Sequence, residues 1–195
     1  MDVTAFFKAE FPEHVTVTRD TEAALEKAFG ELVAACAISL RAGGKLMLFG
    51  NGGSAADAQH LATEFTIRYK KDRTAIAAIA LTTDTSALTA AGNDIGFERV
   101  FSRQIEALGK AGDVAIGIST SGKSPNVAAA LKQARAMRIV TAALTGKGGG
   151  DLPNLADHLL IVPSDTTARI QEMHITVGQM LCGAIEIELG LAPSG

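Results

Sequence analysis

The sequence has little cysteine and no concentrated positive charge. It has only two cysteines in 195 residues, Cys36 and Cys182, each in an apolar pattern typical of a helix. This spacing favours buried thiols in a reducing compartment over a disulfide framework or a zinc ribbon. The 18 Lys and Arg residues are scattered, and the formal net charge is −3. The chain therefore lacks the electrostatic footprint of a protein that binds nucleic acid or an anionic membrane, and we expect a small-molecule ligand.

Long apolar runs are also absent. No uninterrupted apolar stretch reaches the ~18 residues that a membrane span needs. The first residues, MDVTAFFKAEFPEHV, lack a basic leader followed by an apolar core and a small-residue cleavage site. We therefore expect no membrane contact and a cytoplasmic location.

Short apolar segments alternate with segments of helical periodicity along the chain. Apolar residues recur at helical spacing over residues 19–40, and Gly43 and Gly44 then stop the helix. Nearly continuous apolar strands are predicted at 45–50, 75–81, 113–119, 139–145 and 158–163, the first four separated by segments long enough for helices. This alternation predicts an α/β fold with a doubly wound, five-stranded parallel sheet covered by helices on both faces, as in flavodoxin-like proteins. We expect one domain over residues 1–195, with residues 1–42 forming a helical segment that packs in an oligomer.

The loop after the first predicted strand, in GNGGSAADAQHLATEF, is the first candidate ligand site. Asn51, Gly52 and Gly53 allow positive φ angles and close backbone approach, and Ser54 is predicted to cap a helix that begins at Ala55. Such a loop presents N–H groups to an oxygen-rich ligand. A tight turn with an ordinary helix cap is the alternative.

The loop after the third predicted strand, in GISTSGKSPNVAAAL, gives a stronger anion-binding signal. It has four hydroxyl residues around Gly122, with Pro125 as the first helical residue, and these hydroxyl residues are Ser119, Thr120, Ser121 and Ser124. Residues 117–124 also match the nucleotide-binding pattern G-x-x-x-x-G-K-[ST]. However, Gly117 lies inside the apolar strand, which leaves a loop too tight for a β-phosphate, and no acidic magnesium ligand follows an apolar run. The pattern therefore favours a single phosphate over a nucleoside triphosphate.

Two predicted helices combine polar residues with an apolar face. His60 and Glu64 are spaced i, i+4, about 6 Å along the helix axis, and can converge on one metal ion or substrate, although a simple hydrogen-bonded pair has the same spacing. The C-terminal helix is predicted to run to Gly190 and to bury its apolar residues, namely Ile170, Met173, Ile175, Val177, Met180 and Leu181. Its Gln171, His174 and Gln179 form a polar patch with Gln171 at its centre, whereas Glu172 points elsewhere. Buried amides and imidazoles cost free energy unless they are satisfied, so the patch indicates an interface or a site.

Three motifs in order resemble one family over nearly the whole chain. GNGGSAADAQHLATEF, LTTDTSALTAAGNDIGFERVFSRQIEALGKAGDVAIGISTSGKSPN and ARIQEMH are similar to the phosphoheptose isomerases, which have the sugar isomerase (SIS) fold. The family interconverts sedoheptulose 7-phosphate and D-glycero-D-manno-heptose 7-phosphate, the first step of bacterial heptose synthesis for surface lipopolysaccharide. The resemblance implies a homotetramer with active sites at subunit interfaces.

The resemblance also implies roles for individual residues. Glu64 would be the base that moves a proton between C1 and C2 through an enediol, and Gln171 would assist it. One zinc ion per subunit would be bound by His60, Glu64, Gln171 and a fourth residue. The sugar phosphate would contact Glu64, Gln171 and the loop residues, which are Asn51, Gly52, Gly53, Ser54, Asn93, Asp94, Ser119, Thr120, Ser121 and Ser124.

The fourth metal position is where the chain departs from the family pattern. Family members have a histidine, both a metal ligand and an acid–base group, where this chain has Gln179. An amide oxygen is a weak ligand and cannot exchange a proton near neutral pH. The alternative function is therefore a non-catalytic binding protein of the same fold, like a relative that binds the bacterial replication initiator. That relative lacks the acidic residue matching Glu64, which this chain keeps, so the sequence favours the isomerase.

Overall fold

The computed structural model describes residues 2–192 and contains one parallel five-stranded sheet. The strands are β1 (Leu46–Gly50), β2 (Ala78–Ala80), β3 (Val114–Ser119), β4 (Val140–Thr145) and β5 (His158–Ile161). Their order across the sheet is β2-β1-β3-β4-β5, with all four neighbouring pairs parallel. The sequence-based prediction of a doubly wound five-stranded sheet is confirmed. The chain passes from β1 to β2 at one edge of the sheet, and from β3 to β4 and β5 toward the opposite edge. The strand order therefore reverses between β1 and β3.

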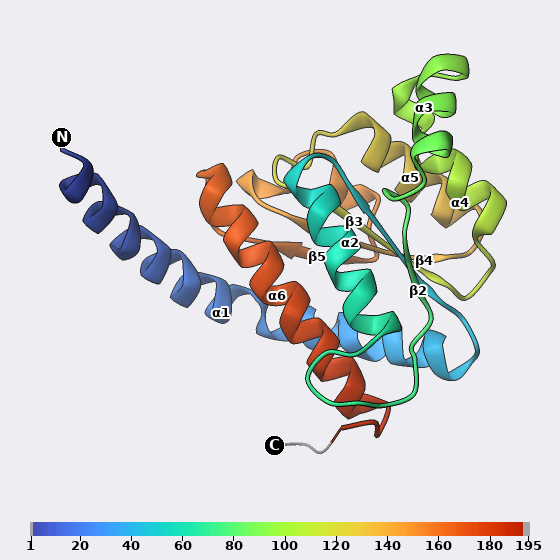
Figure 1. The fold of residues 1–195 in the computed structure, drawn as a ribbon, viewed down its shortest axis with the longest axis horizontal. Helices are drawn as coiled ribbons and strands as arrows, with labels where there is room; N and C mark the ends of the chain where they lie inside the picture. Colours follow the sequence, from blue (N-terminus) through green and yellow to red (C-terminus); the bar gives the residue numbers. More distant parts are fainter. Residues whose placement is uncertain (1, 193–195) are drawn as a thin grey trace.

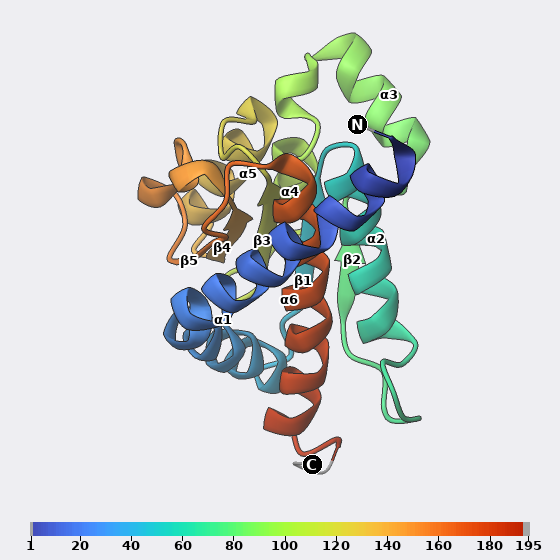
Figure 2. The same ribbon diagram turned by 90° about the vertical axis from the view of Figure 1, so that its left-hand side faces the viewer.

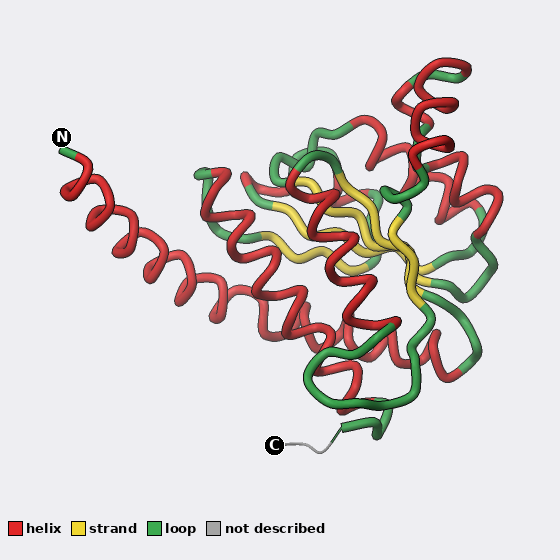
Figure 3. The backbone as a smooth tube through the Cα atoms, in the orientation of Figure 1, coloured by secondary structure: helices red, strands yellow, loops and turns green. Residues whose placement is uncertain are grey.

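Helices cover both faces of the sheet (Figures 1 and 2). One face packs against α1 (Val3–Arg41), α2 (Gly53–Thr66) and α6 (Thr167–Glu188), and the other against α4 (Ser102–Leu108) and α5 (Pro125–Ala136). The tube view shows α3 (Thr85–Asp94) projecting from the upper right of the sheet (Figure 3). Short 3-10 helices complete the chain at Phe97–Arg99, Lys147–Gly149 and Leu152–Asn154.

Alternate strand residues build two separate hydrophobic layers, as the two-residue period of a strand requires. Leu46, Leu48 and Ile116 face α1, α2 and α6, whereas Met47 and Ala115 face α4 and α5. Since both faces are buried, the strands read as continuous apolar runs rather than alternating ones. The two cysteines lie in the first layer as free, buried thiols, as predicted.

Most predicted strands differ from the structure by one or two residues at an end, and other boundaries differ for a physical reason. The first helix begins at Val3 rather than near residue 19. Asp2 caps it by accepting from the amide of Ala5, and Val3, Phe7, Phe11 and Val15 recur at helical spacing on its exposed first turns. The strand predicted at 75–81 is only Ala78–Ala80, because the amide of Ile76 bonds to the carbonyl of Phe65 instead of a neighbouring strand. The last helix ends at Glu188 rather than Gly190.

Candidate active site

The loop after β1 is joined to the first turn of α5, the helix that follows β3, by a reciprocal pair of amide hydrogen bonds. Asn51 Nδ2 donates to Asn126 Oδ1 and Asn126 Nδ2 donates to Asn51 Oδ1, each over 2.9 Å. Asn126 is buried, and its Oδ1 also accepts from the amide of Val127. The pair lies at the carboxyl ends of β1 and β3, where the strand order reverses and where ligands bind in sheets of this kind.

The loop after β3 has the features of a phosphate site. Ser119 Oγ and Ser124 Oγ lie 2.9 Å apart, Pro125 is the first residue of α5 as predicted, and Ser124 occupies the N-cap without a side-chain capping bond. Ser121 Oγ accepts from the amide of Lys123. The hydroxyls thus gather at the positive end of a helix dipole, which favours an anion. Because Gly117 lies inside β3, the loop that follows is too short to surround a β-phosphate as a nucleotide-binding loop does.

Glycine shapes the start of α2 in a way that corrects the prediction for Ser54. The N-cap is Gly52, with φ of 55° and ψ of −120°, a conformation that favours glycine. Ser54 is therefore inside the first turn rather than capping it; its side chain is buried and its amide donates to the carbonyl of Asn51. The Gln171 amide of α6 lies so close to Gly53 that a Cβ there would approach Nε2 to 2.7 Å. Gln171, predicted to be the centre of the polar patch on the C-terminal helix, thus lies against the loop after β1.

Two turns further along α2, three predicted site residues meet. His60 Nε2 lies 3.3 Å from Glu64 Oε1 and 2.5 Å from Gln179 Nε2 on α6. Helices α2 and α6 run side by side in the same direction (Figures 1 and 2), and Gly178 lets Leu61 pack closely between them. The Glu64 side chain is 18% exposed and His60 is 50% exposed, so both are open to a ligand.

These side chains offer a modest set of donors for a metal ion. Within residues 2–192 no group of three His, Cys, Asp or Glu side chains converges as a metal site would require. His60 and Glu64 are strong zinc ligands, and the neighbouring Gln179 adds an amide oxygen when its side-chain amide is turned over. His60 and Glu64 thus offer two strong donors, one fewer than the three protein ligands usual in catalytic zinc sites.

His174 and Glu172 of α6 do not join this group of side chains. His174 is 1% exposed and faces the end of β4, and burial lowers the pKa of its imidazole to about 4, so it is neutral at physiological pH. Glu172 pairs with Arg169 over 2.9 Å and with His14 over 2.8 Å, which agrees with the prediction that it points away from the patch. Met180, predicted to be buried, is 53% exposed and lines a cavity of about 530 Å³ between α1 and α6.

The structure does not bring Asn93 and Asp94 to the other candidates within one chain. Both are exposed at the end of α3, and Asn93 Nδ2 donates to Asp94 Oδ1 over 2.7 Å. Helix α3 has no buried residue, and it lies apart from α6 in both ribbon views (Figures 1 and 2).

Sequence reasoning missed two residues of this region. Asp57 lies three residues before His60 and seven before Glu64, on the same face of α2, and this spacing could have revealed it. Burial raises the pKa of the Asp57 carboxyl, and the nearby His60 opposes the shift. Asn126 gave no sequence signal, because its partner Asn51 lies 75 residues away.

Comparison with known proteins agrees with this arrangement. The SIS domain profile matches residues 11–146. The phosphoheptose isomerase of Paramagnetospirillum magneticum is 58% identical over 186 residues, which is 95% of this chain and 97% of that protein. The phosphoheptose isomerase of Campylobacter jejuni is 57% identical over 91% of this chain and 95% of that protein.

Solved structures give the same result. The phosphoheptose isomerase of Neisseria gonorrhoeae superposes with a TM-score of 0.90 at 44% identity, covering 95% of this chain and all of that one. The Francisella tularensis phosphoheptose isomerase superposes with a TM-score of 0.93 at 35% identity, covering 96% of this chain and all of that one. On these matches, the chain belongs to the phosphoheptose isomerase family of SIS-domain proteins.

Proposed function

We propose that this protein is an aldose–ketose isomerase that interconverts sedoheptulose 7-phosphate and D-glycero-D-manno-heptose 7-phosphate. The observation that supports it best is the meeting of a partly buried carboxylate, Glu64, with His60 on the helix that begins at the loop after β1. Serine hydroxyls and the N-terminus of α5 are available for the phosphate. Family membership supports the same substrate, because the relatives are named for it.

The reaction requires one base and a phosphate anchor. Ser119, Ser121 and Ser124 with the start of α5 hold the phosphate, while Asn51, Gly53 and Gln171 line the sugar end. Glu64 removes a C1 proton of the open-chain ketose while O2 gains a proton, which gives the enediol. Glu64 then returns the proton to C2 while O1 loses its hydroxyl proton, which gives the aldehyde, so that overall one proton moves from C1 to C2 and one from O1 to O2. The carbon skeleton gains and loses no electrons overall, because C1 is oxidised to an aldehyde as C2 is reduced.

A zinc ion is a further part of the proposal, at one ion per subunit. His60 and Glu64 would hold it, with the amide oxygens of Gln171 and Gln179 as weaker ligands. Bound there, zinc supplies Lewis-acid polarisation of a substrate oxygen. Gln179 cannot exchange a proton, so this chain has a weaker acid–base apparatus than the family pattern implies.

We also propose that the protein works as a homotetramer in the cytoplasm, at the first step of heptose synthesis for lipopolysaccharide. Phe6, Phe7 and Phe11 are each more than half exposed on the part of α1 that projects beyond the sheet (Figure 1), and such a patch favours a partner subunit. No helix within residues 2–192 is long and apolar enough to cross a membrane. The two free, buried cysteines suit a reducing compartment.

A non-catalytic binding role is less favoured. Glu64 keeps its place beside His60 with its carboxylate partly open to solvent, an arrangement that a scaffold protein has no need to retain.

Turnover is the direct test. The purified chain is incubated with sedoheptulose 7-phosphate and zinc, and the aldose 7-phosphate is followed by NMR, with Glu64→Gln as the matched control. We expect slow but measurable conversion by the wild type and a loss of at least about a hundredfold in Glu64→Gln. No conversion by the wild type at high enzyme concentration would contradict the proposal.

A further inference from the structure

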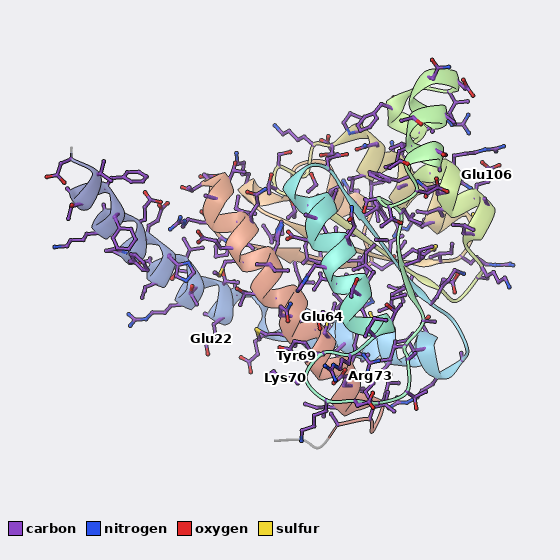
Figure 4. All side chains as sticks on the ribbon, in the orientation of Figure 1. Glu22, Glu64, Tyr69, Lys70, Arg73 and Glu106 are labelled. Carbon is purple, nitrogen blue, oxygen red and sulfur yellow. The ribbon has the colours of Figure 1, made fainter. Side chains whose placement is uncertain are left out.

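A buried arginine outside the candidate site is bonded to the helix end that bears Glu64. Arg73 lies in the loop between α2 and β2, and its side chain is only 3% exposed. Figure 4 shows Arg73 and Tyr69 in this loop, near Glu64, where α2 ends beside α6. Arg73 neither transfers a proton nor contacts the sugar phosphate in the proposed isomerisation.

The guanidinium of Arg73 satisfies carbonyls that the end of α2 leaves free. Nη2 donates to the carbonyl of Glu64 and Nη1 to the carbonyl of Phe65, both over 2.7 Å. The last carbonyls of a helix have no partner inside it, and a cation there also interacts favourably with the helix dipole. Because one of the two carbonyls belongs to Glu64 itself, the contact fixes the backbone from which the proposed base projects.

Arg73 is in turn held by a second helix. Its Nε donates to Glu186 Oε1 over 2.8 Å, and the Glu186 side chain is also 3% exposed. Tyr69 packs against Gly183, one turn earlier on α6, where a Cβ would approach the ring to 3.0 Å. The loop is therefore fastened to α6 at two points, and the arginine links α6 to the last turn of α2.

We propose that Arg73 is a positioning residue for the isomerisation: held by Glu186, it fixes the last turn of α2 and so keeps the Glu64 carboxylate beside His60 in its working place. The inference rests on the proposed role of Glu64 as the base. Lysine cannot replace Arg73, because a single ammonium lacks the planar fork that reaches two carbonyls and a carboxylate at once.

Steady-state kinetics of Arg73→Lys test the proposal. We expect kcat to fall by about tenfold or more, because small displacements of a reacting group are costly, while KM stays within about twofold because the phosphate loop is untouched. The matched control is Arg135→Lys on α5, whose guanidinium also bonds a carbonyl, that of Asn154, and a carboxylate, that of Asp157. The control should keep wild-type kcat and KM. A folded Arg73→Lys variant with kcat within about twofold of the wild type would overturn the proposal.

A second variant covers the case in which Arg73→Lys does not fold. The double change Arg73→Met with Glu186→Met replaces the buried ion pair by apolar side chains, an exchange that buried pairs often tolerate, but it leaves the α2 carbonyls without the guanidinium. We expect the same selective loss of kcat in a folded protein. Recovery of wild-type kcat in this double variant would show that Arg73 only stabilises the fold, and would refute the positioning role.

A spectroscopic measurement separates this inference from the proposed function. The NMR resonances of the His60 ring at constant pH depend on the Glu64 carboxylate 3.3 Å away, whether or not the chain turns over the sugar. Arg73→Lys should move them in the same direction as Glu64→Gln does, and Arg135→Lys should leave them in place. Unmoved His60 resonances in Arg73→Lys would contradict the positioning role even in an active enzyme.

Discussion

At the scale of single residues, Gln179 is the point where this chain departs most from the chemistry of its family pattern. The amide lies 2.5 Å from His60 Nε2, so the side chain occupies the place of a third site member without its proton-transfer ability. The family resemblance predicts a histidine at this position, where this chain has an amide. A single substitution should therefore restore the missing chemistry without rebuilding the site.

Gln179→His is expected to raise kcat/KM for sedoheptulose 7-phosphate by about tenfold or more, since a positioned acid–base group typically contributes at least that much. It should also tighten zinc binding, because an imidazole is a stronger ligand than an amide oxygen. Steady-state kinetics and zinc titration check the two effects.

Thr176→His is the matched control, because it adds a histidine to an exposed position one turn earlier on α6. It should change neither quantity. Equal kinetics in Gln179→His and the wild type would mean that another group already transfers the proton.

Residue-scale sequence reasoning succeeded where one helix supplies both partners. The i, i+4 spacing of His60 and Glu64 predicts their contact, and the structure places them 3.3 Å apart. It failed for Arg73, because the arginine bonds to main-chain carbonyls, which every residue has, and to Glu186 far along the chain. It failed for Ser54 because the positive φ of Gly52 moved the start of α2 earlier than a serine cap predicts.

At the scale of elements, the loop after β1 and the start of α5, the helix that follows β3, are held together because Asn51 and Asn126 bond to each other twice. The strands themselves were predictable, since segments buried on both faces must be continuously apolar. The pairing between the two asparagines was not, because it depends on β1 and β3 being neighbours in the sheet while β2 separates them in sequence.

Asn126→Ala should lower the free energy of unfolding by about 1–3 kcal/mol, because it leaves the Asn51 amide and the Val127 amide without their partner in a buried place. It should also raise KM, since the loop after β1 loses its anchor beside the phosphate site. Urea denaturation and steady-state kinetics measure the two effects. Asn154→Ala, an exposed position in the 3-10 helix after β4, is the control and should alter neither. An unchanged KM in a destabilised Asn126→Ala would restrict the pair to a structural role.

At the scale of the whole molecule, parts of one chain are left without a covering layer. Helix α3 has no buried residue, and it bears Asn93 and Asp94, which the family resemblance assigns to the substrate. The projecting part of α1 exposes Phe6, Phe7 and Phe11, and a cavity opens between α1 and α6. In the proposed tetramer, a neighbouring subunit would cover these surfaces and complete the site. Contacts between subunits cannot be predicted from the periodicity of one sequence, because they depend on how folded chains pack together.

Light scattering should accordingly give the mass of four chains at micromolar concentration. Phe7→Asp places a charge in the apolar patch, beside Phe11, whose ring centroid is 5.2 Å away, and should lower that mass by opening the interface. Ala5→Asp adds the same charge at an exposed position about 160° around the helix from Phe7 and about 100° from Phe6, and it should leave the mass unchanged. Far-ultraviolet circular dichroism verifies that both variants keep the helix. A wild type with the mass of one chain, or equal masses for the two variants, would mean that the aromatic patch of α1 is not the surface that joins the subunits.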